Sequence, residues 1–78
     1  MDVKDKLDGV FQEVFKDDTI VINPETTAND VEGWDSFSHV ILITAIELRF
    51  NIKFSFKEVM SFKNVGDLIR CIERKIAA

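Results

Sequence analysis

The chain has 78 residues, of which 46% are hydrophobic, and this length allows one domain, 1–78, with a single packed core. Fourteen acidic and ten basic residues give a net charge of −4, which argues against nucleic-acid binding by charge neutralisation. The charged N-terminal stretch, with no run of about 20 apolar residues, predicts a cytoplasmic protein without membrane insertion. Cys71 and His39 are single residues of their kinds, so we expect neither a disulfide nor a metal site.

A first amphipathic helix is predicted from apolar residues that recur at spacings of three and four. These residues are Val3, Leu7, Val10, Phe11, Val14 and Phe15. Turn-forming residues, including Pro24 and Gly33, then break the pattern. Residues 17–35 are therefore expected to form a long surface connection, pinned by Ile20, Ile22, Val31 and Trp34.

The second predicted helix runs from Ser36 to about Phe50, with Asp35 as N-cap, because its short carboxylate can accept a free backbone N–H. The run VILI, residues 40–43, has strand propensity, but the apolar segment continues to helical length. Ser55 and Glu58 form a capping-box pattern, which opens a short helix through about residue 61. The last helix is predicted from 65 to about 77.

The stretch GWDSF, residues 33–37, places Ser36 at the first position of an apolar helix. It resembles the acyl and peptidyl carrier proteins, whose mark is GxDSL at the start of the second of four helices. Phe37 is the departure from that motif. The resemblance covers nearly the whole chain. It implies an all-α fold: a small four-helix bundle of acyl-carrier-protein type, with a long loop between helices 1 and 2 and a short helix 3.

The resemblance implies an acyl carrier protein and not an enzyme. In this family a phosphopantetheinyl transferase, the carrier-protein synthase, moves 4'-phosphopantetheine from coenzyme A to the serine hydroxyl, here that of Ser36. Acyl-loading and acyl-processing enzymes then exchange acyl intermediates as thioesters on this covalent cofactor, and the carrier is expected to be a monomer. Independently, free N–H groups at a helix start favour a phosphate. A simple helix-start role would also explain Ser36.

Partner recognition is expected on the second helix, the usual docking surface of the family. Asp35 and Phe37 match motif positions that help the transferase to recognise its site, although capping alone would equally explain Asp35. Where fatty-acid carriers commonly have acids, this chain has Ile41 and Leu48, and only Glu47 remains acidic. We hypothesise that partners dock on an apolar strip of Phe37, Ile41 and Leu48. The alternative is that these side chains fold inward, with Phe37 packed toward the preceding tryptophan.

The apolar docking helix leads us to predict a specialised biosynthetic pathway rather than bulk fatty-acid synthesis. Polyketide, nonribosomal-peptide, lipid and saccharide-modifying pathways all fit. By the same resemblance, the core and any acyl-binding cavity involve Leu42, Ile46, Phe50, Phe54, Val59, Phe62, Leu68 and Cys71. Three phenylalanines in that set predict a filled interior, which favours short or polar cargo.

The residues also allow other interpretations. His39 lies three residues after Ser36, but a serine–histidine dyad lacks an evident oxyanion hole or orienting residue, so we expect His39 to face solvent, where it could contact the phosphate. Cys71 is expected to be buried and inert. Residues 29–33 lack the ligand spacing of a calcium loop. Two alternative functions are a peptidyl or aminoacyl carrier and a helical interaction module without a prosthetic group.

Overall fold

The computed structural model describes residues 3–77, which form four α-helices and a 3₁₀ turn and include no β-strand. The helices are α1 (Val3–Phe15), α2 (Ser36–Phe50), α3 (Phe56–Val59) and α4 (Val65–Ala77), and the turn is η1 (Ala28–Asp30). The predicted all-α bundle, with its long first connection and short third helix, is confirmed. Within the described residues, none of the helices has the length and apolar character needed to cross a membrane.

The bounds of α1, α2 and α4 agree with prediction, whereas α3 is shorter than predicted and η1 was not predicted. Helix α3 ends at Val59 and not at Ser61. The backbone N–H of Ser61 donates to the Glu58 carbonyl at 3.0 Å, and the Ser61 hydroxyl donates to the same carbonyl at 2.8 Å. This three-residue bond tightens the final turn and closes the helix early.

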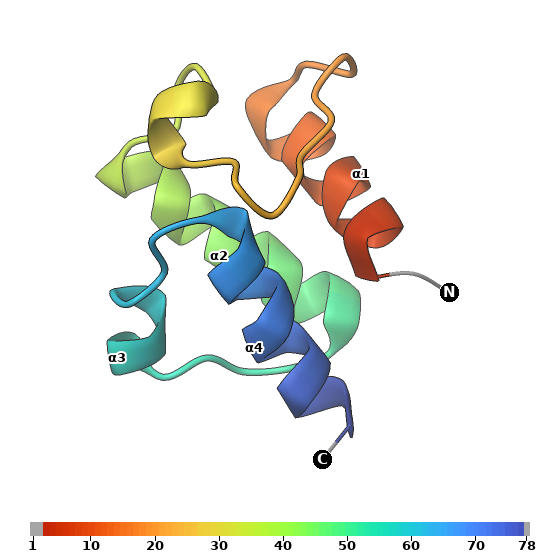
Figure 1. The fold of residues 1–78 in the computed structure, drawn as a ribbon, viewed down its shortest axis with the longest axis vertical. Helices are drawn as coiled ribbons and strands as arrows, with labels where there is room; N and C mark the ends of the chain where they lie inside the picture. The colour runs from red at the N-terminus through yellow and green to blue at the C-terminus, as the bar shows by residue number, and fades with distance from the viewer. Residues whose placement is uncertain (1–2, 78) are drawn as a thin grey trace.

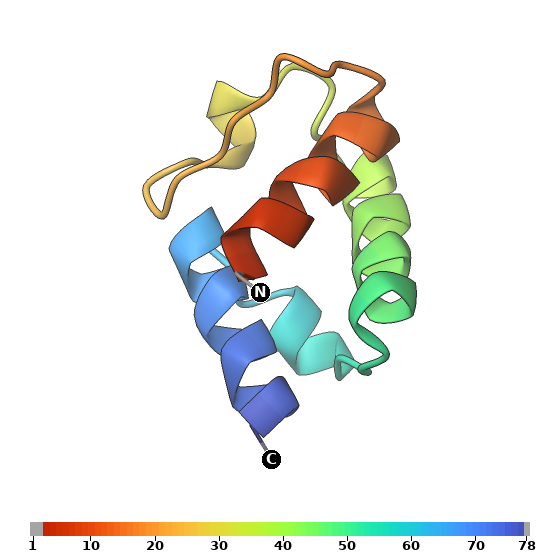
Figure 2. The same cartoon turned by 90° about the vertical axis from the view of Figure 1, so that its right-hand side faces the viewer.

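The three long helices share one hydrophobic core. Figure 1 shows α1, α2 and α4 as the long helices of the bundle, and Figure 2 shows the short α3 between α4 and α2. Each long helix buries the apolar face that its periodicity predicts. The core contains Leu7, Val10, Phe11, Ile22, Leu42, Ile43, Ile46, Val65, Leu68 and Ile72. This packing fixes the direction of α2, and so the place of its first residue.

The long connection between α1 and α2 is pinned to the bundle, as predicted. Ile22 and Val31 are buried, while Ile20 and Trp34 are partly buried and pack against the core or its neighbours. The carboxylate of Asp8 on α1 also accepts the backbone N–H of Ile22 at 2.9 Å. The connection is therefore held by side chains at several points along its length.

The same connection closes the start of α4. The backbone N–H groups of Val65 and Gly66 donate to the carbonyls of Thr26 and Pro24 at 2.8 and 2.9 Å. A Cβ on Gly66 would meet the Pro24 oxygen at 3.0 Å, so glycine permits this close approach. Figure 1 shows the connection, orange to yellow, passing the start of α4 on its way to η1. Free donors at this helix start are thus satisfied by the loop backbone.

Candidate functional site

The start of α2 is fixed by reciprocal hydrogen bonds. Oδ1 of Asp35 accepts the backbone N–H of Ser38 at 2.9 Å, and the backbone N–H of Asp35 donates to Oγ of Ser38 at 2.8 Å. The predicted N-cap is confirmed. The hydrogen bond from the Ser38 backbone is the main cause that holds the pKa of Asp35 below its ordinary value. Sequence reasoning missed Ser38, because the usual partner at this capping-box position is glutamate or glutamine.

Gly33 supplies the turn that leads into this cap. Its φ of 89° lies in the left-handed region, which glycine adopts at little cost. The Ser38 hydroxyl donates to the Gly33 carbonyl at 2.7 Å, so one serine ties the turn to the first helical turn. Gly33 and Asp35 of the motif therefore fix the backbone on which Ser36 is exposed.

Ser36 is exposed at the first position of α2. None of the hydrogen bonds found among residues 3–77 uses its hydroxyl, whereas the Ser38 hydroxyl is fully occupied by the cap. The two serines are separated by one residue, but only Ser36 offers a free and accessible oxygen. This distinction depends on the fold and is not visible in the sequence.

A groove of about 540 Å³ opens beside Ser36, between α2 and α3. Its size falls within the range of about 300–1,000 Å³ that is usual for small-molecule sites. The walls are mostly apolar and include Trp34, Val40, Ile43, Phe56, Val59, Met60, Phe62 and Leu68. The polar lining residues are Asp35, Ser36, His39, Thr44, Lys63 and Asn64. A group attached to Ser36 would therefore have an apolar surface within reach.

The residues predicted for the core and any acyl-binding cavity fall into two groups, because some fill or cover the core and others line the groove. Leu42, Ile46 and Cys71 are packed inside the core, as a filled interior requires. Phe50 and Phe54 are partly buried against the core. The groove lies at the surface of the bundle. Val59 on α3 lines it together with Phe62 and Leu68.

His39 does not face solvent as predicted, because it is partly buried and both ring nitrogens have partners. The indole N–H of Trp34 donates to Nδ1 at 3.0 Å, and Nε2 lies 3.2 Å from the carbonyl oxygen of Val59. Since Nδ1 accepts, the proton of the neutral ring belongs on Nε2, which then donates to Val59. Neither nitrogen is available as a base for Ser36.

The three residues of the predicted apolar strip are exposed. The exposed fractions of Phe37, Ile41 and Leu48 are 76%, 45% and 80%. The Trp34 ring packs against Phe11 at a centroid distance of 5.2 Å and stacks on the His39 ring, and no ring contact joins it to Phe37 within the described chain. The inward-folding alternative is therefore wrong, and the strip is available for contact.

Glu47 differs from these residues, because its carboxylate is engaged within the fold. Oε2 accepts the backbone N–H of Phe54 at 2.9 Å, and the side chain is partly buried. This bond holds the connection between α2 and α3. Glu47 therefore has a structural role in that connection, and its role in partner recognition stays a prediction.

Cys71 is buried on α4, as predicted. Burial raises the pKa of its thiol, and the nearby negative charge of Glu58 adds to this effect. The Cys71 sulfur lies 3.8 Å from a Glu58 oxygen. A buried thiol with a raised pKa is a poor nucleophile.

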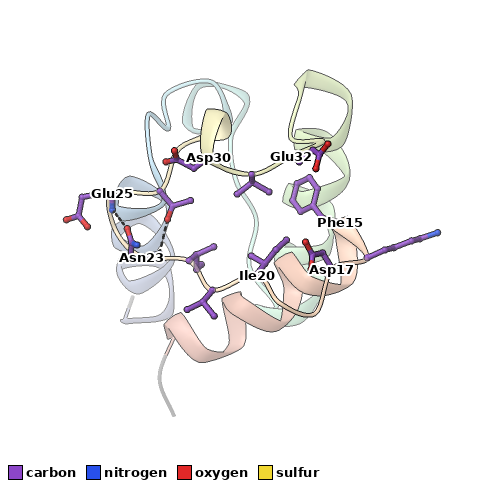
Figure 3. A pocket seen from close by; sticks show the side chains of 12 residues that line it. Phe15, Asp17, Ile20, Asn23, Glu25, Asp30 and Glu32 are labelled. Carbon is purple, nitrogen blue, oxygen red and sulfur yellow. Dashed lines mark hydrogen bonds between the residues drawn. The ribbon is translucent and has the colours of Figure 1, made fainter.

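A larger and more polar hollow, of about 970 Å³, lies between the end of α1 and the long connection. Figure 3 shows Asp30 and Glu32 at the two ends of its upper edge, with Phe15 and Asp17 below Glu32. Neither Ser36 nor any other predicted site residue lines this hollow. The groove beside Ser36 is accordingly the candidate functional site.

Comparisons with known proteins agree with this choice of site. Residues 5–72 match a family model described as a phosphopantetheine attachment site. Among solved structures, the chain is similar to the solution NMR structure of a holo acyl carrier protein from Geobacter metallireducens. The two are 45% identical, the match covers 99% of this chain and 88% of that one, and the TM-score is 0.91. A search of curated proteins found no match.

Proposed function

The chain belongs to the family of acyl carrier proteins with a phosphopantetheine attachment site, and from this premise we propose that Ser36 is its attachment residue. The observation that carries this proposal is the free, exposed Ser36 hydroxyl at the start of α2, beside an apolar groove. Ser38, the neighbouring alternative, is occupied in the helix cap. The Geobacter protein was determined in its holo form, which supports covalent 4'-phosphopantetheine here as well.

Attachment at Ser36 needs a phosphopantetheinyl transferase as partner. A phosphorus–oxygen bond forms to Oγ of Ser36, the phosphoanhydride bond of coenzyme A breaks, adenosine bisphosphate leaves, and the serine proton passes to solvent. The residues around Ser36 fit a phosphodiester, because the first helical turn presents backbone N–H groups and the positive end of the α2 dipole. When bound, the group supplies a terminal thiol that holds an acyl chain as a thioester.

The chain acts in this scheme as carrier and substrate, while partner enzymes load and process the acyl group. Its own residues position Ser36 and shield the acyl group. Asp35 and Ser38 hold the first turn of α2, and the ring nitrogens of His39 are occupied by Trp34 and Val59, so His39 is not placed to act as a base at Ser36.

The groove supports a revised proposal for the cargo. Its walls offer mostly apolar surface between α2 and α3, which favours acyl groups with an apolar segment over short or polar ones. The exposed apolar side chains of α2 support a specialised biosynthetic pathway, whose enzymes match that surface. The two features are neighbours on α2, because the groove adjoins Ser36 and the exposed strip begins at the next residue, Phe37.

The test is loading by purified enzyme. The chain is incubated with coenzyme A, magnesium and the phosphopantetheinyl transferase of the native host, and its intact mass is measured. We expect one phosphopantetheine unit on the wild type and on Ser38→Ala, and none on Ser36→Ala. Folded wild-type protein that gains no mass would instead favour an interaction module without a prosthetic group.

A further inference from the structure

His39 connects the residue before the α2 cap with α3, across the groove beside Ser36. The indole N–H of Trp34 donates to Nδ1 at 3.0 Å, and Nε2 lies 3.2 Å from the carbonyl oxygen of Val59. All three residues line the groove together with Ser36. The imidazole is partly buried, and it is the only histidine in the sequence. We call Trp34, His39 and Val59 the imidazole bridge.

The imidazole bridge requires a neutral ring. An indole N–H can only donate, so the nitrogen that faces it must accept and cannot carry a proton. Protonation adds a hydrogen to Nδ1 and places two donors opposite each other at 3.0 Å. The edge of an aromatic ring carries partial positive charge, so the N–H edge of the indole also repels the cation. An imidazole ordinarily gains this proton between about pH 8 and pH 5, where the other side chains rarely titrate.

The charged groups around His39 favour movement of a protonated ring out of the bridge. Asp35 lies one helical turn before it, where its carbonyl accepts the His39 backbone N–H at 2.8 Å, and a carboxylate at this spacing attracts a cation. Lys63, which follows α3, lines the groove as well and repels a charged ring. Glu58 on α3 competes little, because it accepts a backbone N–H at 2.8 Å and pairs with Lys75 at 3.0 Å.

The proton on His39 is the main change of charge at the bridge over this pH range. Asp35 keeps its charge throughout, because the hydrogen bond from the Ser38 backbone holds the pKa of its carboxyl below the ordinary value. On the side of α1, Trp34 packs against two uncharged rings, those of Phe11 and Phe15, at centroid distances of 5.2 and 6.2 Å. A response of the bridge to mild acid therefore reports protonation of the imidazole.

We infer that the imidazole bridge is a pH-sensitive switch that controls the groove. Protonation of the ring opens the bond to Trp34. As the charged ring turns toward Asp35, it also releases the Val59 carbonyl, so the start of α2 and the short helix α3 lose their hydrogen-bonded link and the groove widens. The opening itself needs no prosthetic group. Its effect on a bound acyl group, which is greater exposure of the thioester in mild acid, rests on the proposed attachment at Ser36.

The first experiment follows the switch in the unmodified full chain by NMR over the same pH range. Trp34 is the only tryptophan, so its indole N–H gives a single resonance. We expect this resonance to move upfield on acidification, with the same midpoint as the ring protons of His39, because the indole loses its acceptor. The control is His39→Gln, whose amide accepts and donates but does not titrate, and its indole resonance should stay in place. Circular dichroism shows whether the variant is folded.

The second experiment measures the groove in chains loaded with octanoyl-phosphopantetheine by the host transferase. Hydroxylamine cleaves the thioester, and the ratio of the wild-type rate to the His39→Gln rate at each pH cancels the pH dependence of the reagent. We expect this ratio to rise about two- to tenfold from the neutral to the acidic end of the range, as for loss of one hydrogen bond.

Three results of the NMR titration would overturn the inference. These are a His39 ring that does not titrate over the range, an indole resonance that does not follow that titration in wild type, and an equal shift in folded His39→Gln. A constant ratio of cleavage rates would also overturn it, because the bridge would then not control the groove. A wild-type chain that cannot be loaded would remove the proposed function alone, since the titration of the unmodified chain still tests the switch.

Discussion

The indole N–H of Trp34 donates to Nδ1 of His39 at 3.0 Å, across the first turn of α2. The other ring nitrogen lies 3.2 Å from the Val59 carbonyl, so His39 joins the start of α2 to α3. Replacement by leucine would remove both bonds and leave a partly buried indole N–H without its partner. We expect His39→Leu to lower the free energy of unfolding by about 1–3 kcal/mol.

Urea unfolding followed by Trp34 fluorescence measures this effect, and His39→Gln is the control because glutamine can still accept and donate. Phosphopantetheine attachment should persist in both folded variants, since His39 has no role as base. Loss of attachment in a folded His39→Leu protein would show that the imidazole takes part in the chemistry.

Two leucines of α2 provide a matched test of the packing. Leu42 is fully buried, whereas Leu48 is 80% exposed. Leu42→Ala leaves a cavity in the core, and we expect a loss of about 2–5 kcal/mol in the free energy of unfolding. Leu48→Ala should change it by no more than about 0.5 kcal/mol. If chemical denaturation shows equal losses of unfolding free energy for Leu42→Ala and Leu48→Ala, α2 is rotated from the orientation described.

The carboxylate of Glu58 predicts how stability responds to acid. The Ser55 backbone N–H, followed by Lys75, lowers the pKa of Glu58 from its ordinary value of 4.5. A carboxyl whose pKa is lower in the folded state stabilises the fold above its unfolded pKa, and this contribution is lost as the pH falls through the folded value. The stabilisation is therefore complete at neutral pH and declines below about pH 4.5.

The measurement compares wild type with Glu58→Gln by urea unfolding over a pH series. We expect the wild type to have the larger free energy of unfolding at neutral pH. The difference between the two proteins should become smaller once the pH drops below 4.5. A difference in free energy of unfolding that grows on acidification would contradict the hydrogen bonds assigned to the Glu58 carboxylate.

The groove can be narrowed without disturbing the core. Val40 lines the groove and is 61% exposed, whereas Ile41 is 45% exposed and does not line it. In protein loaded with an octanoyl group, Val40→Phe should weaken shielding of the thioester and speed its hydrolysis by about two- to tenfold, equivalent to a loss of about 1 kcal/mol. Ile41→Phe should leave hydrolysis unchanged. Equal rates for Val40→Phe and wild type would place the acyl chain outside the groove.

Local sequence signals predicted much of the fold. The apolar periodicity and the Asp35 cap located α1, α2 and α4 to their observed bounds, because these features depend on residues within a few positions of each other. The family motif indicated Ser36, but only the fold distinguishes its free hydroxyl from that of Ser38.

The features that were missed depend on contacts between distant parts of the chain. The carbonyl of Thr26 that accepts from Val65, and the partial burial of His39 against Val59, join residues 20 or more positions apart. The groove likewise arises from the position of α3 relative to α2. No local pattern encodes such tertiary packing.

The most direct test of the central claim identifies the modified residue. Wild-type chain is treated with coenzyme A, magnesium and the host phosphopantetheinyl transferase, digested, and sequenced by tandem mass spectrometry. We expect a single phosphopantetheine unit on Ser36, with Ser38, Ser55 and Ser61 unmodified. Modification of Ser38 in place of Ser36, or a folded protein with no modified serine, would contradict it.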